Sequence, residues 1–279
     1  MKKTILVWAT VMAAGMLALS GCGKKETGQA GEYTNLADKE SRKSVVGELE
    51  ACGVTKEQTA TLEKWAEDYH EITANSYPKG FTALPESGMD YSSILMDDSA
   101  DSYSYLQASN CRLTAFNLIK NQLTTAGTGN DTDLWLMFDI EAIDTMLEYQ
   151  LTKEERADFL TLFNQVSVEG TKTIEEHEEK IQEAWNERDI QISGDKLSLI
   201  SVYLHAPEDQ ARFVGHTGVL AETKEGLLFV EKYSALAPFQ GTYFKDRAEL
   251  KDYLLARPDL YGGETELDPI VMENGTVMK

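Results

Sequence analysis

The sequence has few of the residues on which most catalytic and metal sites are built. Its 279 residues include four histidines and three cysteines. It has no His-Glu-x-x-His pair, no Gly-x-Ser-x-Gly segment, no phosphate-binding glycine loop and no dinucleotide-binding glycine fingerprint. These absences argue against a zinc hydrolase, a serine hydrolase of the α/β type and a nucleotide-dependent enzyme. We therefore expect neither a cofactor nor a metal ion.

Basic residues are also scarce. Lys and Arg number 26 against 47 Asp and Glu, which gives a formal net charge of −21. Nucleic acids and anionic lipid surfaces select basic proteins, so we expect neither as a partner. We interpret the acidic residues as a solvated surface that keeps the protein soluble, and not as an acidic binding site.

One long apolar run is present, and it lies at the amino end. Two lysines precede TILVWATVMAAGMLAL, whose last leucine begins the segment LSGC that ends at Cys22. This pattern is typical of a secretory signal, and a cysteine directly after small residues is the lipid attachment point of a lipoprotein. We predict cleavage before Cys22 and lipidation of its thiol, with an uncleaved membrane anchor as the alternative. Either form would hold the protein on the extracellular face of the cell membrane.

The predicted processing divides the chain into three parts. Residues 1–21 are the signal peptide, and 22–31 are the lipidated cysteine and a flexible polar tether. Residues 32–279 have a length that suits one domain with a proper core. Removal of the signal leaves 24 basic and 47 acidic residues, a net charge of −23.

The body predicts an α+β fold, with a helical front half followed by an antiparallel sheet. Capping boxes and apolar stripes favour helices in the front half, whereas LWLMFDI (134–140) fits a buried strand or a helix start equally well. Three β-rich runs, KLSLISVYL, ARFVGHTGVLAE and GLLFVEKYS, follow, with GTYF as a short fourth. The predicted helices begin at Asp38, Thr55, Asn110, Thr152, Thr173 and Asp246, and the main predicted loops cover 77–101 and 124–133.

Cys111 lies directly behind a good helix-capping residue. With Asn110 as the N-cap, a Cys111 thiolate would face the unpaired amides of the first helical turn, which lower a thiol pKa. Arg112 adds a neighbouring positive charge. Three interpretations stay open: a nucleophile, one half of a disulfide with Cys52, or a small buried apolar residue.

A cysteine nucleophile needs a base, and His216 is the strongest candidate. It lies in FVGHTGVLAE, where glycines mark a place at which another group approaches a strand closely. A hairpin at 224–226 would bring Glu231 roughly level with His216 on one face. Cys111 would then be the nucleophile, His216 the base and Glu231 the orienting carboxylate, with helix amides holding the oxyanion. The alternatives are a core histidine and an exposed glutamate paired with Lys232 or a cross-strand neighbour.

The other three histidines give weaker signals. His177 lies in EEHEEK, which we interpret as a solvated charged helix face. His70 falls close to an apolar stripe and is interpreted as structural. His205 ends a predicted strand and either reaches the end of the sheet that carries His216 or has no role.

Several segments resemble a known family. YTNLADKESRKSVVGEL near the start, NCRLTAF in the middle, and GHTGVL with LLFVEKYSALAPFQ near the end are similar to bacterial, mostly Gram-positive, lipoproteins catalogued as a domain of unknown function. The resemblance covers the body from about Tyr33 to the C-terminus. It implies kinship and no activity.

A looser resemblance concerns the chemistry. A cysteine at a helix start, His-x-Gly-Val on a strand and a polar residue on the next strand are similar to papain-like cell-wall cysteine endopeptidases. This implies a papain-like cysteine hydrolase type, with Cys111 as nucleophile, His216 as base and Glu231 in the third position. The chain has Asn110-Cys111-Arg112-Leu113 where those enzymes have Asp-Cys-Ser-Gly, and their third residue is more often His, Asn or Gln. These departures put the substrate class in question.

Two functional hypotheses follow. The first is a surface-anchored thiol hydrolase that cleaves an amide or related acyl bond, for example in cell-wall peptides, through a thioester on Cys111. Its predicted substrate-binding residues are Asn110, Arg112 and Gln240, with Tyr243 beside Gln240 in the cleft. The second is a non-enzymatic surface lipoprotein that binds a ligand or a protein partner on the same scaffold. The substrate, the third catalytic group and the oligomeric state stay open.

The lipid attachment site gives a direct test. Cys22→Ala should abolish incorporation of a labelled fatty acid and move the protein out of the membrane fraction. Cys22 is the cysteine that directly follows the signal and its small residues, where the lipid is attached. Cys52→Ala is the matched control and should label as the parent chain does. Fatty-acid labelling that persists in Cys22→Ala would contradict the assignment.

Overall fold

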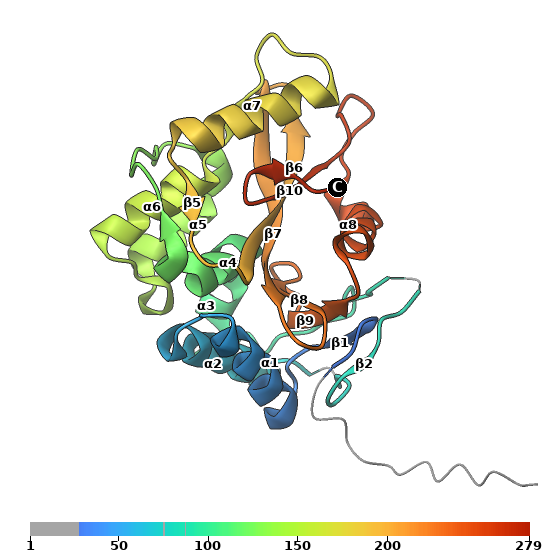
Figure 1. The fold of residues 1–279 in the computed structure, drawn as a ribbon. Helices are drawn as coiled ribbons and strands as arrows, with labels where there is room; N and C mark the ends of the chain where they lie inside the picture. Colours follow the sequence, from blue (N-terminus) through green and yellow to red (C-terminus); the bar gives the residue numbers. More distant parts are fainter. Residues whose placement is uncertain (1–27, 75, 87) are drawn as a thin grey trace, which may run out of the picture.

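The computed structural model describes residues 28–74, 76–86 and 88–279 (Figure 1). The predicted signal peptide, the lipidation site Cys22 and most of the tether lie outside the described residues. Gly31, the last residue of the predicted tether, donates its amide to the Tyr243 carbonyl at 2.8 Å. In the described part, no helix is long and apolar enough to cross a membrane.

The described chain contains eight α-helices and a mostly antiparallel sheet, which confirms the α+β class. The predicted caps form as the sequence indicates. Asp38 accepts the amides of Glu40 and Ser41, and complete capping boxes stand at Thr55 and Thr152. The helices are α1 (Lys39–Ala51), α2 (Lys56–Ile72), α3 (Tyr103–Ala108), α4 (Cys111–Ile119), α5 (Met137–Thr145), α6 (Lys153–Phe163), α7 (Ile174–Glu187) and α8 (Arg247–Leu255).

The sheet is an antiparallel meander with short strands added at both sides. Its centre is β6 (Leu197–Ala206), β7 (Ala211–Glu222), β8 (Leu227–Lys232) and β9 (Phe239–Phe244), and the strand order is β11-β10-β6-β7-β8-β9-β1-β2. The hairpin predicted at 224–226 joins β7 to β8. The short strands are β1 (Glu32–Thr34), β2 (Thr82–Ala83), β4 (Val166–Ser167, on β7), β10 (Ile270–Glu273) and β11 (Thr276–Val277), and β3 (Leu123–Thr124) pairs separately with β5 (Gln191–Ile192).

The sheet separates two hydrophobic cores. One face packs against the helices of the front half through residues such as Val219 and Val230. The opposite face packs against α8 through Leu220 and Phe229 (Figure 1). Because side chains alternate along a strand, Glu231 lies on the same face as Phe229 and points toward α8.

The structure decides the open choice for residues 134–140 and corrects the prediction for His177. LWLMFDI forms a 3₁₀ turn (Leu134–Leu136) and the start of α5, so it is helical. His177 is only 1% exposed, and its prediction as a solvated residue was wrong. It precedes Ile181 and Trp185 by four and eight residues, which places it on the apolar stripe of α7.

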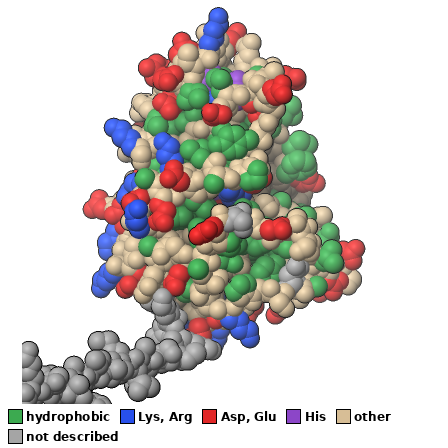
Figure 2. Space-filling view, turned by 90° about the vertical axis from the view of Figure 1, so that its right-hand side faces the viewer, with side chains coloured by type: hydrophobic (Ala, Val, Ile, Leu, Met, Phe, Trp, Pro, Cys, Tyr) green, Lys and Arg blue, Asp and Glu red, His purple; other side chains and the backbone are tan. Residues whose placement is uncertain are grey.

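Acidic side chains lie over the outside of the molecule. Figure 2 shows Asp and Glu side chains around the face that forms the right-hand side of Figure 1, with hydrophobic side chains between them. The large hydrophobic side chains that are exposed elsewhere include Leu134, Met137 and Phe138, which begin α5 or directly precede it.

Two glycines predict opposite effects of the same substitution. At Gly218 on β7, a Cβ would lie 2.5 Å from the Phe229 ring and 2.7 Å from the Val230 carbonyl oxygen. Gly218→Ala should therefore lower the free energy of unfolding by about 1–3 kcal/mol. Gly47 in α1 has open space around its Cβ position, so Gly47→Ala should raise it by roughly 0.5–1 kcal/mol. Urea unfolding measures the free energy of unfolding of both variants. Equal changes in that free energy for Gly218→Ala and Gly47→Ala would contradict the packing around Gly218.

Candidate functional site

The candidate site forms where β7 has an open edge. Strand β8 pairs with β7 only over Gly218–Glu222, and β4 pairs with its beginning at Ala211 and Arg212. Between these contacts, residues 213–217 have β6 as their only described strand neighbour. The start of α4 lies against this gap, where the Arg112 Nη1 donates to the Val214 carbonyl at 2.8 Å.

A β-bulge turns His216 relative to the preceding residues of β7. Val214 pairs with Tyr203 and His216 pairs with Val202, so Gly215 has no partner on β6. A Cβ on Gly215 would lie 2.2 Å from Leu204, which explains why glycine occupies this position. Gly218 pairs directly with Glu231 and follows His216 by two residues, so His216 lies on the face that carries Glu231, whereas the bulge leaves Val214 on the opposite face.

Cys111 is the first residue of α4. The Asn110 side chain caps the helix by accepting the Leu113 amide at 3.0 Å, as the sequence predicts. The Cys111 sulfur lies close enough to the His216 ring and to the backbone amide of Thr217 for both to lower its pKa. The residue as a whole is 9% exposed.

These contacts shift the pKa values of the two groups in opposite directions. Burial opposes ionisation of Cys111, but the hydrogen bond from His216, the charge of His216 and the charge of Arg112 outweigh it and lower the thiol pKa. Burial and the charge of Arg257 disfavour the His216 cation, but its bonds to Cys111 and Glu231 raise its pKa overall. The arrangement therefore favours a thiolate–imidazolium pair.

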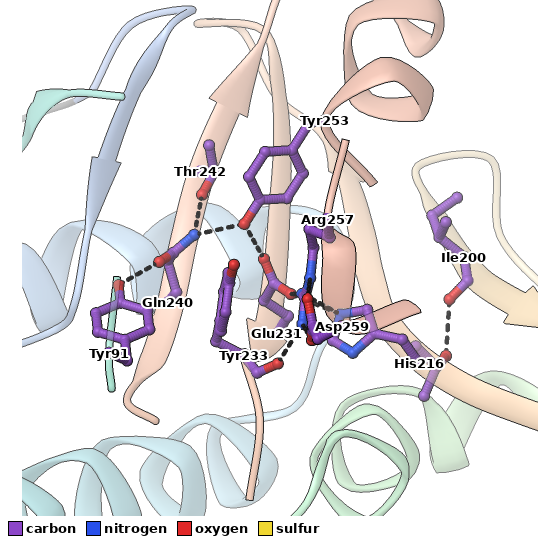
Figure 3. Close-up of polar contacts among 11 residues, drawn as sticks. Tyr91, Ile200, His216, Glu231, Tyr233, Gln240, Thr242, Tyr253, Arg257 and Asp259 are labelled. Atoms are coloured by element: carbon purple, nitrogen blue, oxygen red, sulfur yellow. Dashed lines mark hydrogen bonds and ion pairs between the residues drawn. The ribbon is translucent and has the colours of Figure 1, made fainter. Parts of the chain in front are cut away.

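Glu231 holds the far side of the imidazole. Its Oε2 lies 2.6 Å from Nε2 of His216, and its side chain is fully buried (Figure 3). Arg257 donates to the same oxygen at 3.0 Å, and Tyr253 donates to Oε1 at 2.8 Å. Burial raises the pKa of Glu231, but these contacts outweigh burial and lower it, so the carboxylate stays ionised. Because Nε2 of His216 contacts Glu231, Nδ1 is the ring nitrogen that can interact with the Cys111 thiol.

A second layer of hydrogen bonds supports the carboxylate. The Gln240 Nε2 donates to the Tyr253 hydroxyl at 2.9 Å and its Oε1 accepts from the Tyr91 hydroxyl at 2.6 Å (Figure 3). Gln240 is fully buried, so its side chain contacts these tyrosines and Thr242. Tyr243 is buried as well and belongs to the core on the helical face of the sheet.

The structure thus brings Cys111, His216 and Glu231 together, and we call these three residues the thiol triad. The predicted substrate-binding residues make contacts within the protein. Asn110 donates to Asp139 at 2.9 Å, and Arg112 forms an ion pair with Asp139 at 2.6 Å. Their roles in substrate binding stay predictions.

Sequence reasoning missed three groups of the site. Tyr253 lies in α8 and Arg257 lies in the turn after it. Their sequence context gives no sign of the contact with Glu231. Asp139 did carry a signal, because it is the one charged residue in LWLMFDI. A charge in an otherwise apolar run indicates a buried partner, which here is Arg112.

The predicted alternatives for the cysteines and for Glu231 can be compared directly with the structure. Cys52 and Cys111 are both free thiols, so the disulfide alternative was wrong. Cys52 donates to the Glu222 carbonyl at 3.3 Å, and burial raises its pKa. Glu231 is fully buried, so the alternative of an exposed strand residue was also wrong.

The remaining histidines lie away from the thiol triad. The His70 Nε2 contacts the Asn35 carbonyl at 2.7 Å, in agreement with a structural role. His205 and His177 lie together, with ring centroids 4.9 Å apart. Within the described residues, no group of three or more His, Cys, Asp or Glu side chains is placed to hold a metal ion.

Comparison with known proteins places the described body in one family. Residues 32–278 match the family model described as "Domain of unknown function (DUF4300)". No curated protein and no solved structure matches the chain.

The pKa shifts predict that the two described cysteines differ in reactivity. Because the pKa of Cys111 is lowered, its thiol stays ionised at pH values at which an ordinary thiol is already protonated. The midpoint of its iodoacetamide alkylation rate should therefore lie below that of an ordinary thiol, and the midpoint for Cys52 should lie above it. His216→Ala should raise the Cys111 midpoint, because burial then acts unopposed by the imidazole. Peptide mass spectrometry reads both sites, and equal midpoints would contradict the site geometry.

Proposed function

The chain belongs to the DUF4300 family, and we propose that this member is a thiol hydrolase. In this proposal it is held on the extracellular face of the cell membrane by a lipid on Cys22. It cleaves an amide or related acyl bond in a peptide of the cell wall.

One observation carries the proposal. The thiol at the start of α4 lies beside an imidazole that lowers its pKa, and the Nε2 of this imidazole contacts a buried carboxylate at 2.6 Å. An inert core cysteine needs only apolar neighbours, whereas burial of His216 and Glu231 costs free energy unless both are fully paired. The paired groups therefore support a chemical role for the thiol.

The residues of the site suffice for a two-step acyl transfer. The Cys111 thiolate attacks the carbonyl carbon, and the C=O π electrons move onto the oxygen. The imidazolium of His216 then gives the Nδ1 proton to the leaving amine as the C–N bond breaks, which leaves a thioester on Cys111. His216 next takes a proton from water, and the resulting hydroxide attacks the thioester and releases the acid and the thiolate.

The first turn of α4 can stabilise the oxyanion. The Thr114 amide makes the first helical bond, to the Asn110 carbonyl, and the Leu113 amide donates to the Asn110 side chain. The amides of Cys111 and Arg112 precede these bonds and have no partner within the helix. They therefore supply N–H donors at the positive end of the helix, directly beside the nucleophile.

A papain-like type is part of this proposal. It is supported by the order of the groups, with a nucleophile at the start of a helix and a base and an acid on consecutive antiparallel strands. Glu231 takes the third position, where it orients His216 and keeps its charge throughout. Gln240 and Tyr253 act as positioning residues behind Glu231.

A peptide substrate suits the surroundings of the thiol. Arg112 donates to the Trp135 carbonyl at 3.2 Å, so the segment that precedes α5 adjoins the start of α4. This segment and α5 carry the exposed side chains of Leu134, Met137 and Phe138. They offer apolar contacts to the side chains of a peptide beside the reacting bond.

The small exposure of the site favours the rival function. The side chain of His216 is 3% exposed and that of Glu231 is fully buried. A non-enzymatic lipoprotein would keep the same polar groups as a well-paired interior and would bind its partner elsewhere. Activity measurements separate the two proposals.

Substitutions in the thiol triad test the hydrolase. Cys111→Ala should abolish release of new amino groups from peptidoglycan peptides, and Cys52→Ala should leave the release unchanged. Glu231→Gln should lower kcat by about 100-fold or more and narrow the pH profile on its alkaline side, because loss of the carboxylate lowers the pKa of His216 and the imidazolium is lost at a lower pH. Mass spectrometry of the parent chain should show an acyl group on Cys111. If the parent chain and Cys111→Ala are equally active, or both inactive, on cell-wall peptides, the hydrolase proposal is wrong. The non-enzymatic binding lipoprotein would then be the remaining proposal.

A further inference from the structure

A second cluster of titratable groups lies at the start of β7. Arg212 and His205 are paired on β7 and β6, and α7 brings His177 against them. A cavity of 350 Å³ opens beside them, and its lining includes both histidines. We call it the histidine cavity. Its volume is within the range of small-ligand sites.

Both imidazoles have a tautomer fixed by their neighbours. The Nε of Arg212 can only donate, and it donates to Nδ1 of His177 at 3.0 Å. The backbone amide of Leu267 donates to Nδ1 of His205 at 3.0 Å. Each ring must therefore carry its proton on Nε2, so both present an N–H donor and neither has a free lone pair.

This arrangement disfavours a metal ion. A histidine that binds a metal donates its other ring nitrogen to an acceptor and coordinates through a lone pair. In His177 and His205, Nδ1 accepts a hydrogen bond and Nε2 carries the proton. Neither ring nitrogen therefore offers a free lone pair to a metal ion. Burial, together with the charges of Arg212 and His205, lowers the pKa of His177 to about 4, so the ring is neutral near pH 7.

The positive charge of Arg212 lacks a paired anion. Arg212 is fully buried, and its Nη1 donates to the backbone carbonyls of Tyr203, Leu267 and Asp268. Its Nη2 is buried with no hydrogen-bond partner, and no described carboxylate lies within ion-pair distance of the guanidinium. Glu266 and Asp268 act on it only from farther away. A buried guanidinium without a counter-ion is unusual in a chain with a net charge of −21.

The lining of the histidine cavity combines donors with apolar surface. The exposed Lys172 lies at the cavity, and no Asp or Glu is among the described residues that line it. Val168, Pro207 and Leu267 supply apolar contacts. Neutral N–H donors, a lysine and a nearby unpaired guanidinium surround the cavity, and Glu266 and Glu176 act on the two rings from outside its lining.

We propose that the histidine cavity binds a small organic acid. The Nε2–H groups of His177 and His205 donate to its carboxylate, and Lys172 and Arg212 supply the opposite charge. The carbon chain of the acid lies against Val168, Pro207 and Leu267. This site is separate from the thiol triad and does not depend on the proposed hydrolase activity.

The tautomers are tested first. Nitrogen-15 NMR of the full chain in neutral detergent, with labelled histidine, should show protonated Nε2 and unprotonated Nδ1 for His177 and His205 at pH 7. Addition of Zn²⁺ should leave both signals in place. A proton on Nδ1 of either ring, or Zn²⁺ bound through Nε2, would overturn the proposal.

Binding is tested with probes that share a carbon chain and differ in charge. Calorimetry should show that hexanoate binds the full chain and that hexylammonium does not. His205→Leu should weaken hexanoate at least tenfold, since it removes a hydrogen bond to a charged group. Lys172→Ala should weaken it by about two- to fivefold, as expected for an exposed ion pair. Lys153→Ala, another exposed lysine at a helix start, is the matched control and should have no effect.

The other outcomes of the calorimetry contradict the proposal. Equal binding of hexanoate and hexylammonium would indicate an apolar cavity without charge selection. Preferential binding of inorganic phosphate would replace the organic acid by a simple anion, and no binding of hexanoate would remove the site. Because Lys172 is exposed, Lys172→Ala keeps the test valid even if His205→Leu fails to fold.

Discussion

The contact between the start of α4 and the open edge of β7 is the interaction on which the site depends. Arg112 reaches across this junction to the Val214 carbonyl, while its ion pair with the fully buried Asp139 fixes it from the other side. Removal of either partner would leave the charge of the other largely buried and without compensation, which destabilises the junction. The intact junction sets Cys111 against His216 and Thr217.

The second constraint is the burial of the Glu231 carboxylate. Its ionised form is stable in the interior because His216, Arg257 and Tyr253 all contact it. These partners come from a neighbouring strand, from α8 and from the turn that follows it, so the carboxylate ties the last helix to the sheet. The stability of this end of the fold and the orientation of the imidazole therefore rest on the same hydrogen bonds.

Histidine has opposite environments in the middle of β7 and beside its start. At His216 a carboxylate accepts from the ring and raises its pKa, which favours the cation. At His177 a guanidinium donates to the ring and lowers its pKa, which favours a neutral N–H donor. The same residue type thus suits proton transfer in the middle of the strand and anion recognition beside its start.

The sequence by itself determined the local features of this protein. Capping residues at Asp38, Thr55 and Asn110 mark helix starts because their side chains bond amides only two or three residues away. The period of two along a strand, with the hairpin at 224–226, likewise placed His216 and Glu231 on one face, although Glu231 pairs with Gly218 and not with His216.

Only the tertiary structure decided which distant groups meet. The pairing of Arg112 with Asp139, the contact of Arg257 with Glu231 and the burial of His177 beside Arg212 all join segments separated by many residues. A buried charge looks the same in sequence as an exposed one. Its partner is set by how helices dock on the sheet, and that depends on the packing of both cores at once.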